Sequence, residues 1–294
     1  MDTKTEVRDF LTSRRAKITP EEVGLVSYGT RQVPGLRREE VATLAGISVD
    51  YYNRMERGSL AGVSDDILKA VAGALRLDDA ERAHLVDLAR ASKRRPARGR
   101  RGTATARSVR PSIAWMIDAM DGVAAFAVNG RQDILAANPL GRAFCAPVFE
   151  AQEPANMVRF TYLDPRAREF FADWDRMAKE CAAALRAQAA HEPFDRELSD
   201  LVGELSTRSA EFAASWATHD VRLHHRAEKR FRHPLVGGLT LHFERLAMSA
   251  DPGLEILTYV PEPGSRSAEA FAFLASHAAG DRGRPGDVSA EPLD

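Results

Sequence analysis

A chain of 294 residues is long enough for two ordinary domains, and its 44% apolar and 28% charged content is typical of a soluble globular protein. A net charge of −1 does not exclude nucleic-acid binding, because positive charge can gather on one face. No stretch reaches the ~18 apolar residues of a membrane span, and the charged start MDTKTEVRDFLTSRRAK lacks the apolar core of a secretory signal. We therefore expect a cytoplasmic protein without membrane insertion.

Residues 1–91 are expected to form one domain of short helices separated by Gly, Pro and Ser/Asp breaks. The first helix has an apolar face with i, i+3, i+4 spacing, made by Val7, Phe10 and Leu11. Ser64 and Asp78 each precede a later apolar stripe and are candidate N-caps. This pattern predicts an all-α N-terminal domain.

Residues 37–58 predict a helix-turn-helix, in which a short helix and a tight turn lead into a second short helix. Gly46 breaks the first helix, and Ser48 can cap a second one from Val49 to about Arg57. Gly58 then ends it as a C′ glycine. Because an α-helix fits the major groove of B-DNA, this motif predicts sequence-specific DNA binding. A plain helical bundle with a charged, solvated face is the alternative.

The second helix of the motif presents four candidate base contacts, Val49, Asp50, Asn53 and Arg54. Arg54 can pair bidentately with guanine, and Asn53 can address adenine. Asp50 can accept a hydrogen bond from cytosine N4, and Val49 can contact a thymine methyl group.

Three further residues of the motif, Arg38, Ser48 and Tyr51, suit DNA phosphates, which fix register without reading sequence. Residues on the opposite face of the motif are expected to pack inward: Ile47, Tyr52 and Met55. Residues 92–110, SKRRPARGRRGTATARSVR, contain many arginines and no acidic residue, as expected of a flexible basic linker that adds salt-sensitive affinity for DNA.

Residues 111–278 mix strand and helix patterns and predict an α+β domain with a single sheet, and residues 279–294 predict a disordered tail. Asn129-Gly130 signals a hairpin. The elements expected after it are helices at about 165–189 and 195–217, strands in RAEKRFRHP, GGLTLHFERLAM and GLEILTYVP, and a closing helix in SAEAFAFLASHA.

An apolar pocket between sheet and helices is where such a domain can host a ligand, and four core residues are candidates to line it: Phe126, Trp174, Met177 and Phe243. The histidines crowded at 219–242 lack the spacing of a metal site, so surface or structural roles are favoured. Cys145 and Cys181 are expected to be reduced core thiols. We therefore expect no metal, no catalytic residues and no nucleotide cofactor.

Blocks along almost the whole chain carry a resemblance to a known family. VPGLRREEVATLAG and ISVDYYNRMERG resemble the helix-turn-helix of Xre/Cro-type repressors. The resemblance extends to one branch, the MmyB-like transcription regulators, through RPSIAWMIDAMDGVAAFAVNGRQDILAANPLGRAFC, FTYLDPRAREFFADWD, LVGELSTRSAEFAASWATHDVR, KRFRHPLVGGLTLHFERLAM and YVPEPGSRSAEA. Only the basic linker and the tail fall outside it.

The resemblance implies a mainly α, lambda-repressor-like helix-turn-helix domain followed by an α+β, PAS-like domain that binds a small ligand, with a fatty acid as one candidate. It also places Arg38, Ser48, Val49, Asp50 and Arg54 at DNA-facing positions. Val49 and Asp50 stand where well-known phage repressors have glutamines, so the operator sequence does not follow.

From these features we expect a dimeric regulator that binds double-stranded DNA and whose response to an apolar ligand alters that binding. Two other classes stay open, a protein-interaction adaptor acting on the transcription machinery and a small-molecule enzyme. Failure to retain any DNA from a randomised pool would favour the adaptor. A compact constellation of titratable groups in one pocket would favour the enzyme.

Overall fold

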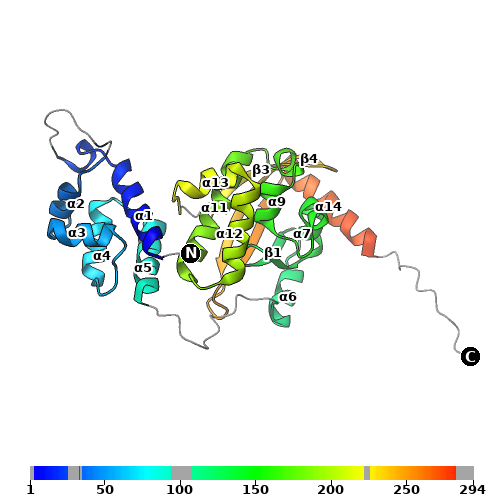
Figure 1. The fold of residues 1–294 in the computed structure, drawn as a ribbon. Coiled ribbons are helices and arrows are strands. Elements are labelled where there is room, and N and C mark those ends of the chain that lie inside the picture. Colours follow the sequence, from blue (N-terminus) through cyan, green and yellow to red (C-terminus); the bar gives the residue numbers. More distant parts are fainter. Residues whose placement is uncertain (1–2, 26–32, 34, 94–107, 222–225, 283–294) are drawn as a thin grey trace, which may run out of the picture. The chain divides into compact units, whose positions relative to one another are not determined.

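The computed structural model describes residues 3–25, 33, 35–93, 108–221 and 226–282 (Figure 1). The chain divides into two units. The first unit comprises residues 1–104 together with 179–223, and the second comprises residues 105–178 together with 224–294. Each unit is described here by itself.

The first unit is helical. Its N-terminal part contains α1 (Thr3–Lys17), the 3-10 helix η1 (Glu21–Val23), α2 (Arg38–Leu44), α3 (Val49–Glu56), α4 (Asp65–Ala74) and α5 (Asp79–Lys93). Its later part contains most of α11 (Trp174–His191), followed by α12 (Arg196–Arg208) and α13 (Ala210–Ala217). α1 packs on α3 and α5, and α2 packs on α3 and α4.

The helix starts in the N-terminal part are those that the sequence predicts. Ser48 Oγ accepts a hydrogen bond from Tyr51 N at 3.1 Å, and Ser64 Oγ accepts one from Ile67 N at 3.4 Å. Asp78 and Glu81 form a reciprocal capping box, with backbone-to-carboxylate distances of 2.9 and 3.0 Å. These three predicted caps are confirmed.

The second unit is built on a five-stranded antiparallel sheet with strand order β2-β1-β5-β4-β3. The strands are β1 (Ala124–Asn129), β2 (Ile134–Ala137), β3 (Arg226–His233), β4 (Gly237–Ala247) and β5 (Leu254–Pro261). The sheet confirms the predicted α+β class, and β3, β4 and β5 occupy the three predicted strand runs.

Helices cover both faces of β1, and all six of its residues are buried. The helices of this unit are α6 (Pro111–Asp118), α7 (Pro139–Phe144), α8 (Ala146–Ala151), α9 (Met157–Leu163), α10 (Arg166–Phe170) and α14 (Arg266–Arg282). Ile113 and Ile117 of α6 pack with Ala125 and Ala127 of β1. Alternate strand residues point to opposite faces, so Phe126 points away from these two alanines.

An aromatic cluster forms the core on the face that α7 and α14 cover. The Phe144 ring of α7 lies 4.9 Å from Phe231, 5.3 Å from Tyr259 and 5.6 Å from Phe271, measured between ring centroids. Tyr259 in turn contacts Phe243, which is its partner across β4 and β5. Tilted and edge-on aromatic pairs of this kind stabilise a core beyond the area they bury.

Three predicted elements differ from the structure in detail. The β1–β2 hairpin does not turn tightly at Asn129-Gly130, because the Asn129 side chain accepts hydrogen bonds from the backbone of Arg131 and Asp133 and a longer loop results. The left-handed residue of that loop is Gln132, with φ of 64°. The helix expected at 195–217 is two helices, because the side chain of Ser209 caps α13.

The helix expected at 165–189 is also divided, into α10 and α11, because Phe171 makes a β-bridge to Phe231. Cys145 and Cys181 are buried free thiols, and burial raises the pKa of Cys145. Most of the predicted basic linker and tail lies outside the described residues, so the boundaries at 91, 110 and 278 stay predictions. No helix in the described part of the chain is both long and apolar enough to cross a membrane.

Candidate nucleic-acid interface and ligand cavity

The turn between α2 and α3 is set by local backbone bonds. Gly46 has φ of 65°, in the left-handed region that favours glycine, and Ile47 N donates to Ala42 O at 3.0 Å. The cap at Ser48 then starts α3. This arrangement is the helix-turn-helix that the sequence predicts, and in Figure 1 the two helices lie next to each other.

Gly58 ends α3 and also permits a close approach to α1. It has φ of 96°, and a Cβ atom at this position would lie 2.5 Å from the carbonyl oxygen of Lys4 on α1. Glycine is therefore required for two reasons, its backbone conformation and the contact with α1. The sequence predicts only the first.

The four candidate base contacts share the outer face of α3, opposite Tyr52 and Met55, which are fully buried. Val49 is 42% exposed although it is apolar, and Asp50 and Arg54 are exposed, while Asn53 is half-buried. Val49 does not belong to the buried core cluster, which suits contact with a partner such as a thymine methyl group.

Tyr51 and Arg54 interact with each other on this face. The Arg54 guanidinium carbon lies 4.6 Å from the centre of the Tyr51 ring, within the range of a cation–π interaction. Tyr51 therefore orients Arg54. Whether Tyr51 also contacts phosphate stays a prediction.

Glu56 at the end of α3 joins three helices and is not among the residues predicted from the sequence. Its side chain is 1% exposed, and it accepts hydrogen bonds from Arg15 at 2.8 Å, Thr12 at 3.0 Å and Arg38 at 2.6 Å. Burial raises the pKa of Glu56, but the hydrogen bonds from Arg15 and Arg38 outweigh burial and lower the pKa overall. Arg38 is therefore held at the surface, 55% exposed, by a buried carboxylate.

A cavity of about 480 Å³ lies beside the start of α3 and brings predicted and unpredicted residues together. Its lining residues are Arg15, Val33, Arg37, Arg38, Glu39, Val49 and Asn53. Arg37, which is not among the predicted contacts, adds a cation next to Arg38 at the start of α2. The sequence signal for this pair is the two adjacent arginines of GLRREE, of which only Arg38 is predicted to contact DNA.

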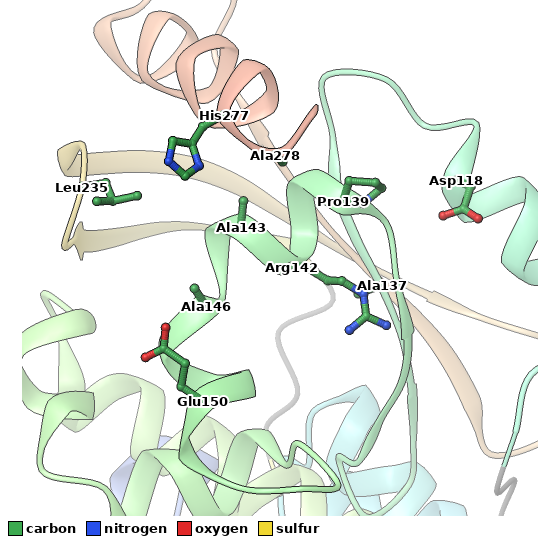
Figure 2. A pocket seen from close by; sticks show the side chains of 10 residues that line it. All are labelled: Asp118, Ala137, Pro139, Arg142, Ala143, Ala146, Glu150, Leu235, His277 and Ala278. Atoms are coloured by element: carbon green, nitrogen blue, oxygen red, sulfur yellow. The ribbon is translucent and has the colours of Figure 1, made fainter. Parts of the chain in front are cut away.

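The second unit contains a larger cavity, of about 720 Å³, between α7, α8, α14 and the β3–β4 turn (Figure 2). It is lined by Asp118, Ala137, Pro139, Arg142, Ala143, Ala146, Glu150, Leu235, His277 and Ala278. Leu235 and Asp118 lie at opposite ends in Figure 2. Small apolar side chains with a few polar groups among them are typical of a ligand site.

Comparison with known protein families supports both parts of this description. The model of the MmyB-like transcription regulator ligand binding domain matches residues 109–274, which is more than half of the chain. The chain belongs to the MmyB-like transcription regulators. A helix-turn-helix domain model matches residues 9–85. No curated protein sequence matches the chain significantly.

This MmyB-like regulator is therefore a DNA-binding transcription regulator with a ligand-binding domain. The helix-turn-helix match contains α2 and α3, and the ligand-binding match contains the five-stranded sheet and the 720 Å³ cavity except for His277 and Ala278. The predicted resemblance to this family is confirmed.

The four residues predicted to line a ligand site all lie in the regulator's second unit, where Phe126 and Phe243 both contact Tyr259. Phe126 is fully buried and contacts Tyr259, and Trp174 donates to the Thr161 carbonyl at 2.9 Å. Met177 and Phe243 are close, because Lys229 Nζ lies 3.8 Å from the Met177 sulfur and 4.1 Å from the Phe243 ring centre. None of the four lines the 720 Å³ cavity.

Two histidines of the regulator have clear structural roles. His233 joins β3 to α7, with Nε2 3.1 Å from the Ala143 carbonyl and Nδ1 accepting from Leu235 N at 3.2 Å. Burial lowers the pKa of His233. His219 contacts Glu6 and Arg186 in the first unit, and His224 and His225 lie outside the described residues. Within the described ranges, no group of His, Cys, Asp and Glu side chains could hold a metal ion.

Proposed function

We propose that this MmyB-like regulator reads a specific DNA sequence with α3 and that an apolar ligand in the second unit changes its affinity for DNA. The observation that carries the DNA part is the outer face of α3, where Val49, Asp50, Asn53 and Arg54 stand apart from the core. In this proposal α3 enters the major groove and Arg54 pairs with a guanine.

Arg37 and Arg38 flank this face and are proposed to bind phosphate. The 480 Å³ cavity that they line beside Val49 supports this assignment. Ser48 and Tyr51 stay proposed phosphate contacts, and the arginines of residues 92–110 are proposed to add sequence-independent affinity. The regulator is proposed to act as a homodimer whose two recognition helices reach half-sites about one DNA turn, ~34 Å, apart.

The proposed ligand is apolar with an anionic end, and a fatty acid is one candidate. The 720 Å³ cavity supports this because alanine, proline and leucine side chains line it beside Arg142 and His277. The Arg142 guanidinium lies 5.0 Å from the Phe149 ring centre. A carboxylate at Arg142 with a chain along the apolar lining would satisfy both kinds of surface. Phe126, Trp174, Met177 and Phe243 stay proposed as residues that a longer ligand would reach.

The DNA part is tested by selecting bound duplexes from a randomised pool and comparing the wild type with Arg54→Ala. We expect the variant to lose preference at one base position, at a cost of ~1–3 kcal/mol, because one bidentate contact is lost. Arg82→Ala is the matched control, since Arg82 is an exposed arginine on α5 outside the helix-turn-helix. A uniform loss over all sequences would assign Arg54 to phosphate, and a wild type that retains no DNA would favour the adaptor function.

A further inference from the structure

A buried ionic cluster joins α1 to α11 and α13 inside the first unit. Arg186 of α11 is 1% exposed and pairs with Glu6 of α1, which is itself buried. Arg186 also donates to the Trp216 carbonyl and lies 4.1 Å from the Trp216 ring centre. Arg186 Nη1 is 3.0 Å from His219 Nδ1. Burial of a charge is costly without a partner, so these groups hold one another in place.

A second set of ion pairs extends this cluster along α1. Arg14 is buried and lies 3.2 Å from Glu81 of α5 and 3.1 Å from Asp220, and Lys17 lies 2.7 Å from Asp220. The Arg14 guanidinium also donates to the carbonyl of His219, whose φ of 54° lies in the left-handed region. An L residue in that conformation is strained unless its contacts hold it there.

Apolar contacts accompany the ion pairs. Ala190 of α11 and Val221, both buried, belong to the same core cluster as Val7, Phe10 and Leu85. The segment 179–223 therefore completes the core of the α1–α5 group, which we call the head. By sequence, however, this segment belongs to the ligand-binding match at residues 109–274.

The opposite side of α1 contacts the recognition helix. Thr12 and Arg15 of α1 bind Glu56 at the end of α3, and the backbone of Lys4 lies against Gly58. One helix thus binds the ligand-domain segment through Glu6 and Arg14 and the DNA-reading helix through Thr12 and Arg15. A displacement of α1 would change both sets of contacts.

We propose that the Arg186–Glu6–His219 cluster couples the ligand-binding domain to DNA binding. In this proposal α1 is the helix that transmits a change from one to the other. This inference rests on the proposed function, because it supplies the route by which a bound ligand would reach α3. Coupling between two sites is reciprocal, so DNA on α3 must also change the segment 179–223. That consequence can be tested without any ligand.

The test is hydrogen exchange of the full chain, measured by mass spectrometry. The variants are Arg186→Gln, Glu6→Gln and, as matched control, Arg208→Gln, since Arg208 is an exposed arginine of the same segment paired with Glu204. Without DNA, we expect Arg186→Gln to speed exchange in α1 and α3, and Glu6→Gln to speed it in residues 210–221, each by about tenfold. Arg208→Gln should change neither region.

The second arm adds a DNA duplex that the wild type selects from a randomised pool. We expect DNA to slow exchange in residues 210–221 of the wild type and of Arg208→Gln but not of Arg186→Gln. Arg186→Lys keeps the charge and should restore part of this response, which separates coupling from a general loss of folding.

Two results would overturn the proposal. One is an Arg186→Gln effect confined to residues 174–221, with α1 and α3 exchanging as in the wild type. The other is a wild type in which bound DNA leaves residues 210–221 unchanged. If the wild type selects no DNA at all, the proposed function fails, and the arm without DNA still decides whether the cluster links α1 to the segment 179–223.

Discussion

His84 on α5 is a polar side chain in an apolar place. It is 2% exposed and packs edge-on against Phe10 with ring centroids 4.8 Å apart. Among the described residues, neither of its ring nitrogens has a hydrogen-bond partner. Burial lowers the pKa of His84 to about 4; the charge of Glu6 raises this pKa by a smaller amount, and the charge of Arg186 lowers it further. The ring is therefore neutral in the folded protein near pH 7.

We predict that the free energy of unfolding of His84→Leu depends less on pH, below about pH 6.5, than that of the wild type. Between about pH 6.5 and pH 4 the unfolded chain binds a proton at His84 and the folded chain does not, so falling pH destabilises the wild type. The slope from this group is at most ~1.4 kcal/mol per pH unit. Leucine cannot titrate, so the variant should lose that slope. Urea unfolding at pH 7, 6 and 5 measures it.

The control for this prediction is His242→Gln, because His242 is an exposed histidine on β4. Its substitution should leave the slope as in the wild type. Glu6 does not affect this comparison. Burial raises the pKa of Glu6, but His219 and Arg186 lower it to about 2 overall. The stability that the ionised Glu6 contributes is therefore lost only as the pH falls below about 4.5. An unchanged slope in His84→Leu would show that His84 is not neutral and buried in solution.

At the residue scale, the sequence predicts what depends on near neighbours. The caps at Ser48, Ser64 and Asp78 each bond to an amide three residues later, so the pattern is visible in a short window. Glu56 binds Arg15 from 41 residues away, and Arg186 binds Glu6 from 180 residues away. No local pattern separates such a buried charge from a solvated one.

At the scale of elements, the approach of α1 to the end of α3 depends on Gly58. We predict that Gly58→Ala costs about 3 kcal/mol of stability, because it adds a steric clash with the Lys4 carbonyl to the cost of a left-handed alanine. Gly62→Ala is the matched control, since Gly62 has φ of 83° but no atom within 4 Å of the added Cβ. It should cost only about 1 kcal/mol. Urea unfolding compares them, and equal losses would contradict the close contact.

The sequence predicts where helices and strands lie more accurately than it predicts where one helix ends and the next begins. β4 matches an alternating run because buried and exposed residues alternate along it, whereas β5 lies inside the sheet and is buried at most of its positions. The break between α12 and α13 was missed because Ser209 interrupts an amphipathic pattern that otherwise continues. A serine in such a pattern can cap a new helix or face solvent within a continuing one, and tertiary packing decides between them.

At the scale of the whole molecule, the sequence predicts the two functional domains but not the way the helices are shared. The amphipathic stretch at 179–223 shows an apolar face without showing what covers it. The structure places this segment in the same unit as α1–α5. The 720 Å³ cavity could not be predicted for a similar reason. Core aromatics and pocket aromatics have the same spacing, so the sequence does not separate the buried Phe126 and Phe243 from residues that line a cavity.

The last prediction concerns the ligand proposed for the 720 Å³ cavity. We expect native mass spectrometry with sodium myristate to show one added ligand per chain, and Arg142→Glu to weaken binding by about tenfold or more, because a carboxylate then faces a carboxylate. Arg232→Glu, an exposed charge reversal on β3, is the matched control and should bind as the wild type does. A neutral fatty alcohol should be less sensitive to Arg142→Glu, since it lacks the charge that Arg142 would pair with.

The same spectra report whether the protein is dimeric, and DNA titrations with and without myristate report whether the ligand changes the affinity for DNA. Equal binding by Arg142→Glu and Arg232→Glu would place the ligand outside this cavity, and an absent adduct would exclude a long-chain acid as the ligand.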